Sequence, residues 1–233
     1  MSRRAVMRVI CLLGLMAALL FVSAGRANLV FFWGFLGIEA FGWVLMLANQ
    51  DQCLFQERIR PAPGGIDRRL RRAMTALFGL HLVIAGLDAG RFGWSKVPGA
   101  LQVTALLGLA VAFGLTAWAQ RVNSFFSPVV RIQAERGHHL VTDGPYRFVR
   151  HPGYLGVAAL MILCGPALGS WWAMAPNVLA VVLLLRRAVI EDRFLHDHLG
   201  GYVDYAKRVR YRVLPGEVVP TVVEFERSIL FAS

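Results

Sequence analysis

The chain has 233 residues, of which 57% are hydrophobic, and its formal net charge is +11 at pH 7. Soluble domains are less apolar, and here the apolar residues form long blocks, which excludes an ordinary soluble globular domain. The basic residues flank these blocks instead of forming one stripe, so we expect no nucleic-acid partner.

The first apolar block runs from Ala5 to Ala24, directly after Arg3 and Arg4. About 20 apolar residues suffice to cross a hydrocarbon layer roughly 30 Å thick. A signal peptide is the alternative, because the small residues before Gly25 resemble a cleavage site, but its apolar region would be only about 7–15 residues. A second apolar block follows almost at once, which favours a retained first transmembrane helix.

Five further apolar blocks follow in chain order: Leu29–Asn49, Ala73–Asp88, Gly99–Gln120, Tyr154–Gly169 and Trp171–Leu185. The third block and the last two are short, so they tilt little, thin the bilayer locally or form a hairpin partly covered by protein. The pattern predicts an all-α fold, a polytopic membrane helical bundle of about five to six transmembrane helices.

Basic residues set the predicted orientation. If the N-terminus is cytoplasmic, every Lys and Arg except Arg26, Arg91 and Lys96 lies on the inside. We therefore expect a multi-pass protein of the cell (inner) membrane with both termini in the cytoplasm. Residues 1–120 would hold four transmembrane helices and a basic loop, 50–72, that contacts membrane lipids. Residues 121–233 would form a second region, with a helical hairpin at 153–187 and a cytoplasmic tail.

Polar residues become dense after Gln120 and lead to a turn at Asp143-Gly144-Pro145-Tyr146. Pro152 disfavours helical dihedrals at His151 and suits a first helical position. The free N–H groups of the new helix would then lie beside Arg150 and His151, as in an anion site. An ordinary helix start with interfacial Arg and Tyr is the alternative interpretation.

A second charged group, Arg187 and Glu191, ends the last apolar block. The two residues are four apart, so they share one helix face. The short link 166–170 would return this group to the level of Arg150 and His151. Charged groups that converge beside an apolar wall suggest a site for a polar cofactor and a lipophilic substrate. A surface ion pair of little energetic value is the alternative.

No metal site is predicted. Cys11, Cys53 and Cys164 are far apart and form no metal-binding pair. His138 and His139 are adjacent, and in an extended segment their side chains would point in opposite directions.

Three motifs carry a family resemblance: the segment 144–156, then Arg187-x-x-x-Glu191-Asp192, then Tyr202-x-x-Tyr205 with its continuation to Pro215. Together they resemble the isoprenylcysteine carboxyl methyltransferase family, over about residues 123–215. Phe148 departs from the commoner Tyr, and Asp143 departs from a common Ser. Phospholipid N-methyltransferases share part of the pattern in looser form.

The resemblance implies a methyltransferase region at 121–233 with S-adenosyl-L-methionine as methyl donor. It implies catalytic roles for Arg150, His151, Arg187 and Glu191. The cofactor-binding residues that it implies are Gln133, His138, Leu140, Gly144, Pro145, Tyr146, His151, Pro152, Tyr154, Gly156, Glu191 and Asp192, with the first three on a strand upstream of the motif. A carboxylate or thiolate acceptor needs no general base, whereas an amine or hydroxyl would, and His151 is then the candidate.

The acceptor stays open at this point: a lipophilic small molecule or a lipidated substrate from the bilayer. An N- or S-methyltransferase of phospholipids or small molecules is one alternative, and a sterol-reductase-like enzyme using NADPH is another. The chain lacks the longer helix set of those reductases and their basic cluster for a 2′-phosphate. Two isolated polar residues in the apolar blocks, Glu39 and His81, are interpreted as packing residues, with a buried pair or a substrate entrance as alternatives.

Overall fold

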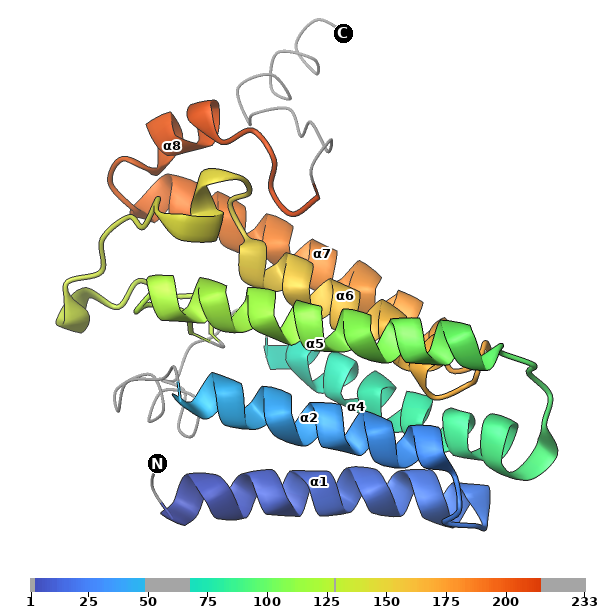
Figure 1. Cartoon of the computed structure of the whole chain (residues 1–233). Coiled ribbons are helices and arrows are strands. Elements are labelled where there is room, and N and C mark those ends of the chain that lie inside the picture. The colour runs from blue at the N-terminus through green and yellow to red at the C-terminus, as the bar shows by residue number, and fades with distance from the viewer. Residues whose placement is uncertain (1–2, 49–67, 128, 215–233) are drawn as a thin grey trace, which may run out of the picture.

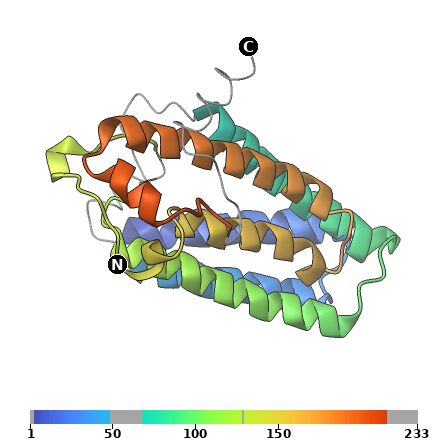
Figure 2. The ribbon, with the colours of Figure 1, turned by 90° about the horizontal axis from the view of Figure 1, so that it is seen from above.

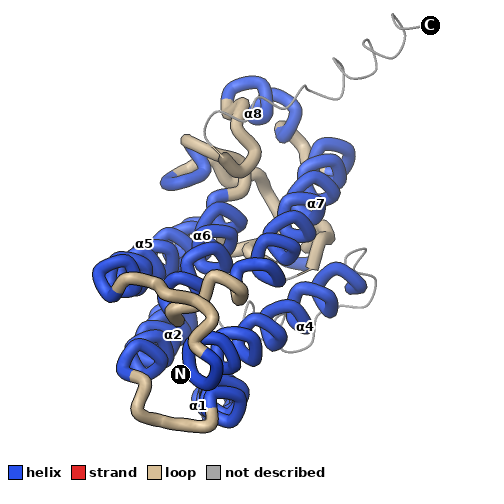
Figure 3. The backbone as a smooth tube through the Cα atoms, turned by 90° about the vertical axis from the view of Figure 1, so that its right-hand side faces the viewer, coloured by secondary structure: helices blue, strands red, loops and turns tan. Residues whose placement is uncertain are grey.

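The computed structural model describes residues 3–48, 68–127 and 129–214. These residues form helices and connecting loops, and no strand element occurs among them (Figure 3). The predicted all-α polytopic bundle is thus confirmed. Most of the predicted basic loop, 50–72, lies outside the described residues.

Four helices are long and apolar enough to cross a membrane. They are α1 (Arg3–Ala24), α2 (Val30–Ala48), α4 (Arg68–Ala85) with its π-helical continuation η1 (Gly86–Phe92), and α5 (Gly99–Val122). Gly25, with φ +70°, ends α1 in the left-handed region that glycine adopts without strain. The chain is a multi-pass membrane protein by these helices.

The third block is longer than the sequence predicted, because the helix continues past Asp88 to Phe92. Asp88 is fully buried yet satisfied: it accepts hydrogen bonds from the backbone N–H of Ser95 at 2.7 Å and from the Ser170 hydroxyl at 2.6 Å. The Ser95 hydroxyl donates a further bond. Because three donors satisfy the carboxylate, the helix continues past Asp88, whereas the apolar block predicted from the sequence ended at this charge.

Helices α6 (Pro152–Ala167) and α7 (Met174–His198) form the expected hairpin. Gly169, with φ +76°, makes the turn, and the Ser170 hydroxyl accepts from the Ala173 N–H at 3.0 Å where α7 begins. The predicted block ended at Leu185, but α7 continues through charged residues to His198. A charge run ends an apolar block without ending a helix, because Arg and Glu are good helix formers.

The six long helices of the described residues form a closed ring in the order α1, α2, α5, α6, α7, α4, each packed against the next and α4 against α1 (Figure 3). Figures 1 and 2 show the same helices from the side and from above. The end where α6 begins and α7 finishes is called the site end below. Helix α8 (Tyr202–Arg208) and the loops before α6 lie at this end.

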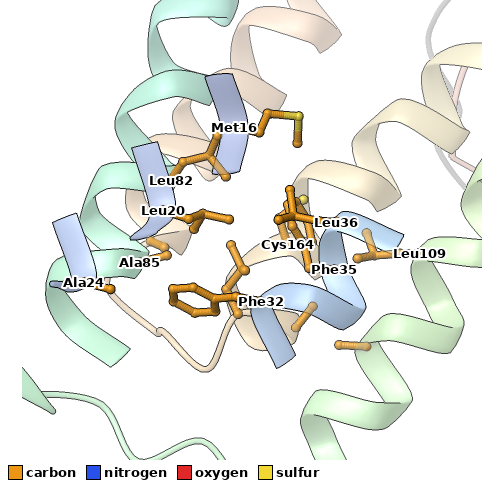
Figure 4. Close-up of a cluster of buried hydrophobic side chains, with 14 residues drawn as sticks. Met16, Leu20, Ala24, Phe32, Phe35, Leu36, Leu82, Ala85, Leu109 and Cys164 are labelled. Atoms are coloured by element: carbon orange, nitrogen blue, oxygen red, sulfur yellow. The ribbon is translucent and has the colours of Figure 1, made fainter. Parts of the chain in front are cut away.

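The hydrophobic core fills the other end of the ring, called the far end below (Figure 4). Side chains from the end of α1, the start of α2 and the end of α4 meet those from the start of α5 and the end of α6. The core includes Leu20, Phe32, Phe35, Leu82, Ala85, Leu109, Ala167 and Leu168, each almost fully buried. The ring is therefore packed solid at the far end and leaves its open volume toward the site end.

Replacing Asp88 by Ala should destabilise the far end. The change leaves two serine hydroxyls without their buried acceptor and frees the start of α7, so we expect a loss of about 2–4 kcal/mol. Thermal unfolding in detergent measures it. Asp204→Ala is the control, because the exposed Asp204 pairs only with the exposed Lys207, and equal melting temperatures for both variants would contradict this role.

Candidate functional site

A cavity of about 630 Å³ occupies the ring toward the site end. All six ring helices line it, together with residues of the loops before α6 and with α8. Leu12, Met16 and Phe113 belong to its apolar half, while His151 and Glu191 belong to its polar half. The volume falls within the range of about 300–1,000 Å³ for small-molecule and cofactor sites.

The start of α6 fixes the polar wall. Pro152 is the first residue of the helix, as predicted, and His151 precedes it with φ −127°. A Cβ on Gly156 would lie 2.2 Å from the Thr116 hydroxyl, so only glycine lets α6 approach α5 this closely. Gly156 therefore allows α5 and α6 to pack closely together. It is not among the described residues that line the cavity.

A buried carboxylate, Asp192, ties this wall together. Arg150 binds it in a bidentate pair, Nε to Oδ1 at 2.8 Å and a terminal nitrogen to Oδ2 at 3.1 Å. His151 Nε2 lies 3.2 Å from Oδ1, the Tyr202 hydroxyl donates at 2.7 Å, and Arg212 Nε donates at 3.1 Å. The carboxylate thus joins the start of α6, the end of α7, helix α8 and the segment after it.

The charges in this cluster shift its ionisation. Burial by itself would raise the pKa of Asp192, but the hydrogen bonds and charges of His151 and Arg150 outweigh burial and hold the pKa well below its usual range. Burial likewise opposes the charge of Arg150, yet the bonds to Asp192 leave the pKa of its guanidinium raised. Asp192 is therefore ionised and fully occupied by partners, as a structural anchor would be.

The residues that border the cavity beside this cluster form a short chain. Tyr154 donates its hydroxyl to Glu191 Oε2 at 2.5 Å. The Arg187 guanidinium lies over the Tyr154 ring, 5.3 Å from its centroid. The tyrosine thereby holds a cation and a carboxylate on one wall, with the second oxygen of Glu191 available to a ligand.

The opposite wall comes from the loops between α5 and α6. The sequence predicted a strand for Gln133, His138 and Leu140, but a 3-10 turn (Ala134–Arg136) follows Gln133, and Gly137 adopts φ +63°. A 3-10 turn and a left-handed glycine therefore stand where the strand was predicted, ahead of the two histidines. Both His138 and His139 border the cavity, and their ring centroids lie 4.4 and 4.9 Å from that of Phe125. The prediction that the two side chains point in opposite directions was therefore wrong.

His138 presents a donor to the cavity. Its Nδ1 accepts a hydrogen bond from the Gln133 N–H at 3.2 Å, so the proton of the neutral ring is on Nε2. Burial, followed by the neighbouring charge of His139, lowers the pKa of His138. Gln133 itself turns away: its amide bonds to the Phe125 carbonyl and the Arg136 side chain, which fixes the loop.

The predicted turn is a 3-10 turn, Gly144–Arg147, with φ +56° at Gly144. It directs Tyr146 inward, where the hydroxyl accepts from the Asn123 amide at 3.1 Å. Tyr205 of α8 donates to the Tyr146 carbonyl at 2.7 Å. Burial raises the pKa of the Tyr146 hydroxyl, so this residue is an uncharged aromatic wall.

The structure divides the predicted site residues into two groups. Those that line the cavity are His138, Leu140, Tyr146, Arg150, His151, Tyr154, Arg187 and Glu191. The others support the wall from behind and are not among the described residues that line the cavity: Gln133, Gly144, Pro145, Pro152, Gly156 and Asp192. The roles of all these residues in binding or catalysis stay predictions.

Sequence reasoning gave no role to several residues that build the site. Arg212 and Tyr202 hold Asp192, and Asn123 and Phe125 position Tyr146 and His138. Tyr202 and Arg212 lie within the motif after α7, so a signal existed for them. Asn123 and Phe125 carry no motif. Among the described residues no group of three or more His, Cys, Asp or Glu could hold a metal ion.

The fold and the cavity define a polytopic helical membrane protein in which a charged wall and an apolar space share one pocket. Within this class, the isoprenylcysteine carboxyl methyltransferase family matches residues 103–197 of the chain. This segment includes α5, α6 and most of α7, so it carries most of the charged wall. The resemblance drawn from the motifs is thereby confirmed.

Curated relatives agree. Protein-S-isoprenylcysteine O-methyltransferase B of Arabidopsis thaliana is 34% identical over 90 residues, which cover 36% of this chain and 44% of that protein. The protein-S-isoprenylcysteine O-methyltransferases of mouse and human are each 32% identical over 123 residues, covering 50% of this chain and 40% of theirs. The matches thus span less than half the length of these relatives.

Proposed function

We propose that this chain is a membrane methyltransferase that transfers a methyl group from S-adenosyl-L-methionine to a lipophilic acceptor, a carboxylate of the isoprenylcysteine type. One observation carries the proposal: a single cavity joins the charged wall of Arg187 and Glu191 to an apolar space between transmembrane helices. The family match over residues 103–197 and the names of the relatives support the reaction class.

The polar wall fits the proposed methyl donor. Glu191 has an oxygen available to accept from an amino group or a ribose hydroxyl, and His138 presents an N–H. Arg187 provides a donor fork for a carboxylate, and the Tyr146 and Tyr154 rings can face a cation. S-adenosyl-L-methionine would supply a methyl group on a sulfonium: an acceptor oxygen would bond to the methyl carbon while the carbon–sulfur bond breaks, and S-adenosyl-L-homocysteine would leave as a neutral thioether.

In such a displacement the protein contributes position and charge rather than covalent chemistry. The Asp192 cluster holds the side chains of Arg150 and His151. Their backbone N–H groups donate to the carbonyls of Tyr211 and Arg212, at 2.9 and 2.8 Å, so the backbone is held as well. His151 Nε2 faces Asp192, which leaves Nδ1 as the ring nitrogen that is not engaged by the cluster.

The charges around the cavity favour an anionic acceptor. Arg71, Arg131 and Arg187 border it from three different segments, Arg131 in an ion pair with Glu135, while Glu191 is the acidic side chain of the polar wall. A carboxylate acceptor is compatible with this charge and needs no general base. An amine acceptor would enter as an ammonium ion at neutral pH, and an excess of positive charge disfavours binding of a cation.

The same charges bear on orientation. The site end collects the start of α1 and the ends of α5 and α7, where basic residues of the described segments gather. By the positive-inside rule we place this end, with both termini, on the cytoplasmic face of the cell (inner) membrane. The mouth of the cavity would then open to cytoplasmic methyl donor.

Binding of labelled S-adenosyl-L-methionine to the purified protein in detergent tests the site. Glu191→Ala removes a charge-assisted acceptor and releases Tyr154, so its dissociation constant should rise by about 10–100-fold. Glu191→Gln keeps the bond to Tyr154 and should lose less.

The matched control is Asp197→Ala, an exposed acidic residue further along α7. It should bind like the wild type. The site assignment is wrong if Glu191→Ala retains wild-type affinity, and the proposed cofactor is wrong if the wild type binds none.

A further inference from the structure

Glu39 lies deep within the apolar half of the cavity. Its side chain is 5% exposed, and it lines the cavity from the middle of α2, among Met16, Phe113 and Leu160. Within residues 3–48, 68–127 and 129–214 no ion pair reaches Glu39. His81, which the sequence offered as a partner, is not part of the cavity lining of those residues.

The depth of Glu39 follows from helix packing. The Gln120 amide at the site end of α5 donates to the Met46 carbonyl at 3.1 Å, which sets Met46 at that level. Glu39 precedes Met46 by about two helical turns, roughly 10 Å further into the ring. It therefore lies where the hydrocarbon part of an acceptor would extend, well away from the polar wall.

A buried donor stands beside it. Trp43 is one turn from Glu39 on the same face of α2, and its indole N–H is a donor that interacts with the carboxylate. The Nε1 atom is nonetheless buried without a hydrogen bond of normal geometry among the described residues. The nearby Thr116 hydroxyl does not help, because it donates to the Ala112 carbonyl of its own helix at 2.8 Å.

An acceptor and a donor thus face one apolar space, both costly to bury without partners. A hydroxyl group satisfies both at once, since it donates to Glu39 and accepts from Trp43. A plain hydrocarbon chain satisfies neither. The pair also lies outside residues 103–197, the segment that the family matches.

We infer that the acceptor carries a hydroxyl group within its hydrocarbon portion, and that Glu39 with Trp43 selects for it. The inference rests on the proposed function, because it concerns the same cavity and its lipophilic acceptor. A site built to bond a substrate hydroxyl discriminates strongly against the analogue that lacks it, since its own polar groups are then left unpaired.

Matched probes test the inference: N-acetyl-S-geranylcysteine and N-acetyl-S-farnesylcysteine, each with and without a terminal hydroxyl. Binding is measured by thermal stabilisation of the purified protein, and methyl transfer is measured from labelled S-adenosyl-L-methionine. For the chain length that reaches Glu39, the wild type should favour the hydroxylated probe by at least about tenfold in both measurements.

Three variants assign the effect. Glu39→Leu should abolish the preference, because leucine removes the oxygen that would accept from the hydroxyl. Glu39→Gln retains an acceptor and should keep part of the preference, and Trp43→Phe should reduce it. Glu39→Gln also serves if Glu39→Leu does not fold.

The outcomes separate the two proposals. Methyl transfer to plain and hydroxylated probes at equal rates overturns the inference and leaves the function standing. A hydroxyl preference that persists in Glu39→Leu also overturns it. Hydroxyl-dependent binding without methyl transfer overturns the function on these acceptors and supports the inference, and an absence of both overturns both.

Discussion

Asp192→Ala should abolish most methyl-donor binding and destabilise the protein. The change leaves Arg150 and Arg212 buried beside no counter-charge, and removal of one partner from a buried ion pair costs about 3–5 kcal/mol. The start of α6 and the segment after α8 lose their common anchor. We expect binding to weaken by more than about 100-fold, although Asp192 is not among the described residues that line the cavity.

Acid titration of thermal unfolding separates charge from shape at this position. The folded-state pKa of Asp192 is depressed from the ordinary value of 3.8, so its contribution to the free energy of unfolding is complete at neutral pH. It declines as the pH falls below about 4 and is lost as the pH falls through the folded-state pKa. The wild type should therefore lose stability more steeply than Asp192→Asn between about pH 5 and 3.

The control for both measurements is Asp197→Ala, which removes an exposed carboxylate from the same helix. Its binding and its acid profile should match those of the wild type. An Asp192→Ala protein with wild-type affinity and melting temperature would refute the anchoring role.

Arg187→Ala should lower kcat/KM by about 100- to 1,000-fold, the loss typical for removal of one charge-stabilising group. Its guanidinium faces the cavity over the Tyr154 ring and is almost buried. Arg187→Lys keeps the charge but loses the planar fork and its stacking, so we expect an intermediate loss. Steady-state methyl transfer with varied acceptor and varied donor shows which of the two KM values rises.

Arg186→Ala is the matched control, because Arg186 is the exposed neighbour on α7. It removes the same charge from the other face of the helix and should leave kcat/KM within about twofold. A similar loss in both variants would show that net charge, rather than the place of Arg187, matters.

The fold could be predicted from the sequence because membrane helices are encoded locally, in runs of apolar residues. The errors arose where tertiary contacts override local pattern. The predicted apolar block ended at the charge of Asp88, yet Ser95 and Ser170, the latter distant in sequence, satisfy this carboxylate. The end of α7 was set too early for the same reason, since charged residues there face the cavity and α8.

The site was predicted in part. The spacing of Arg187 and Glu191 on one helix face and the hairpin geometry are sufficient to bring them to the level of His151. The arrangement of His138 and His139 could not be predicted, because both rings pack against Phe125, a residue that carries no motif. The place of Glu39 depends on how six helices close into a ring, which no local pattern records.

The Asp192 cluster also bears on biosynthesis. It draws together residues from Arg150 to Arg212, so the charged wall is completed only when the last of these has left the ribosome. By then the six ring helices have been made, and the ring can close around an unfinished wall. Products that stop before Arg212 would lack one of the donors that hold Asp192, so the anchor would stay incomplete.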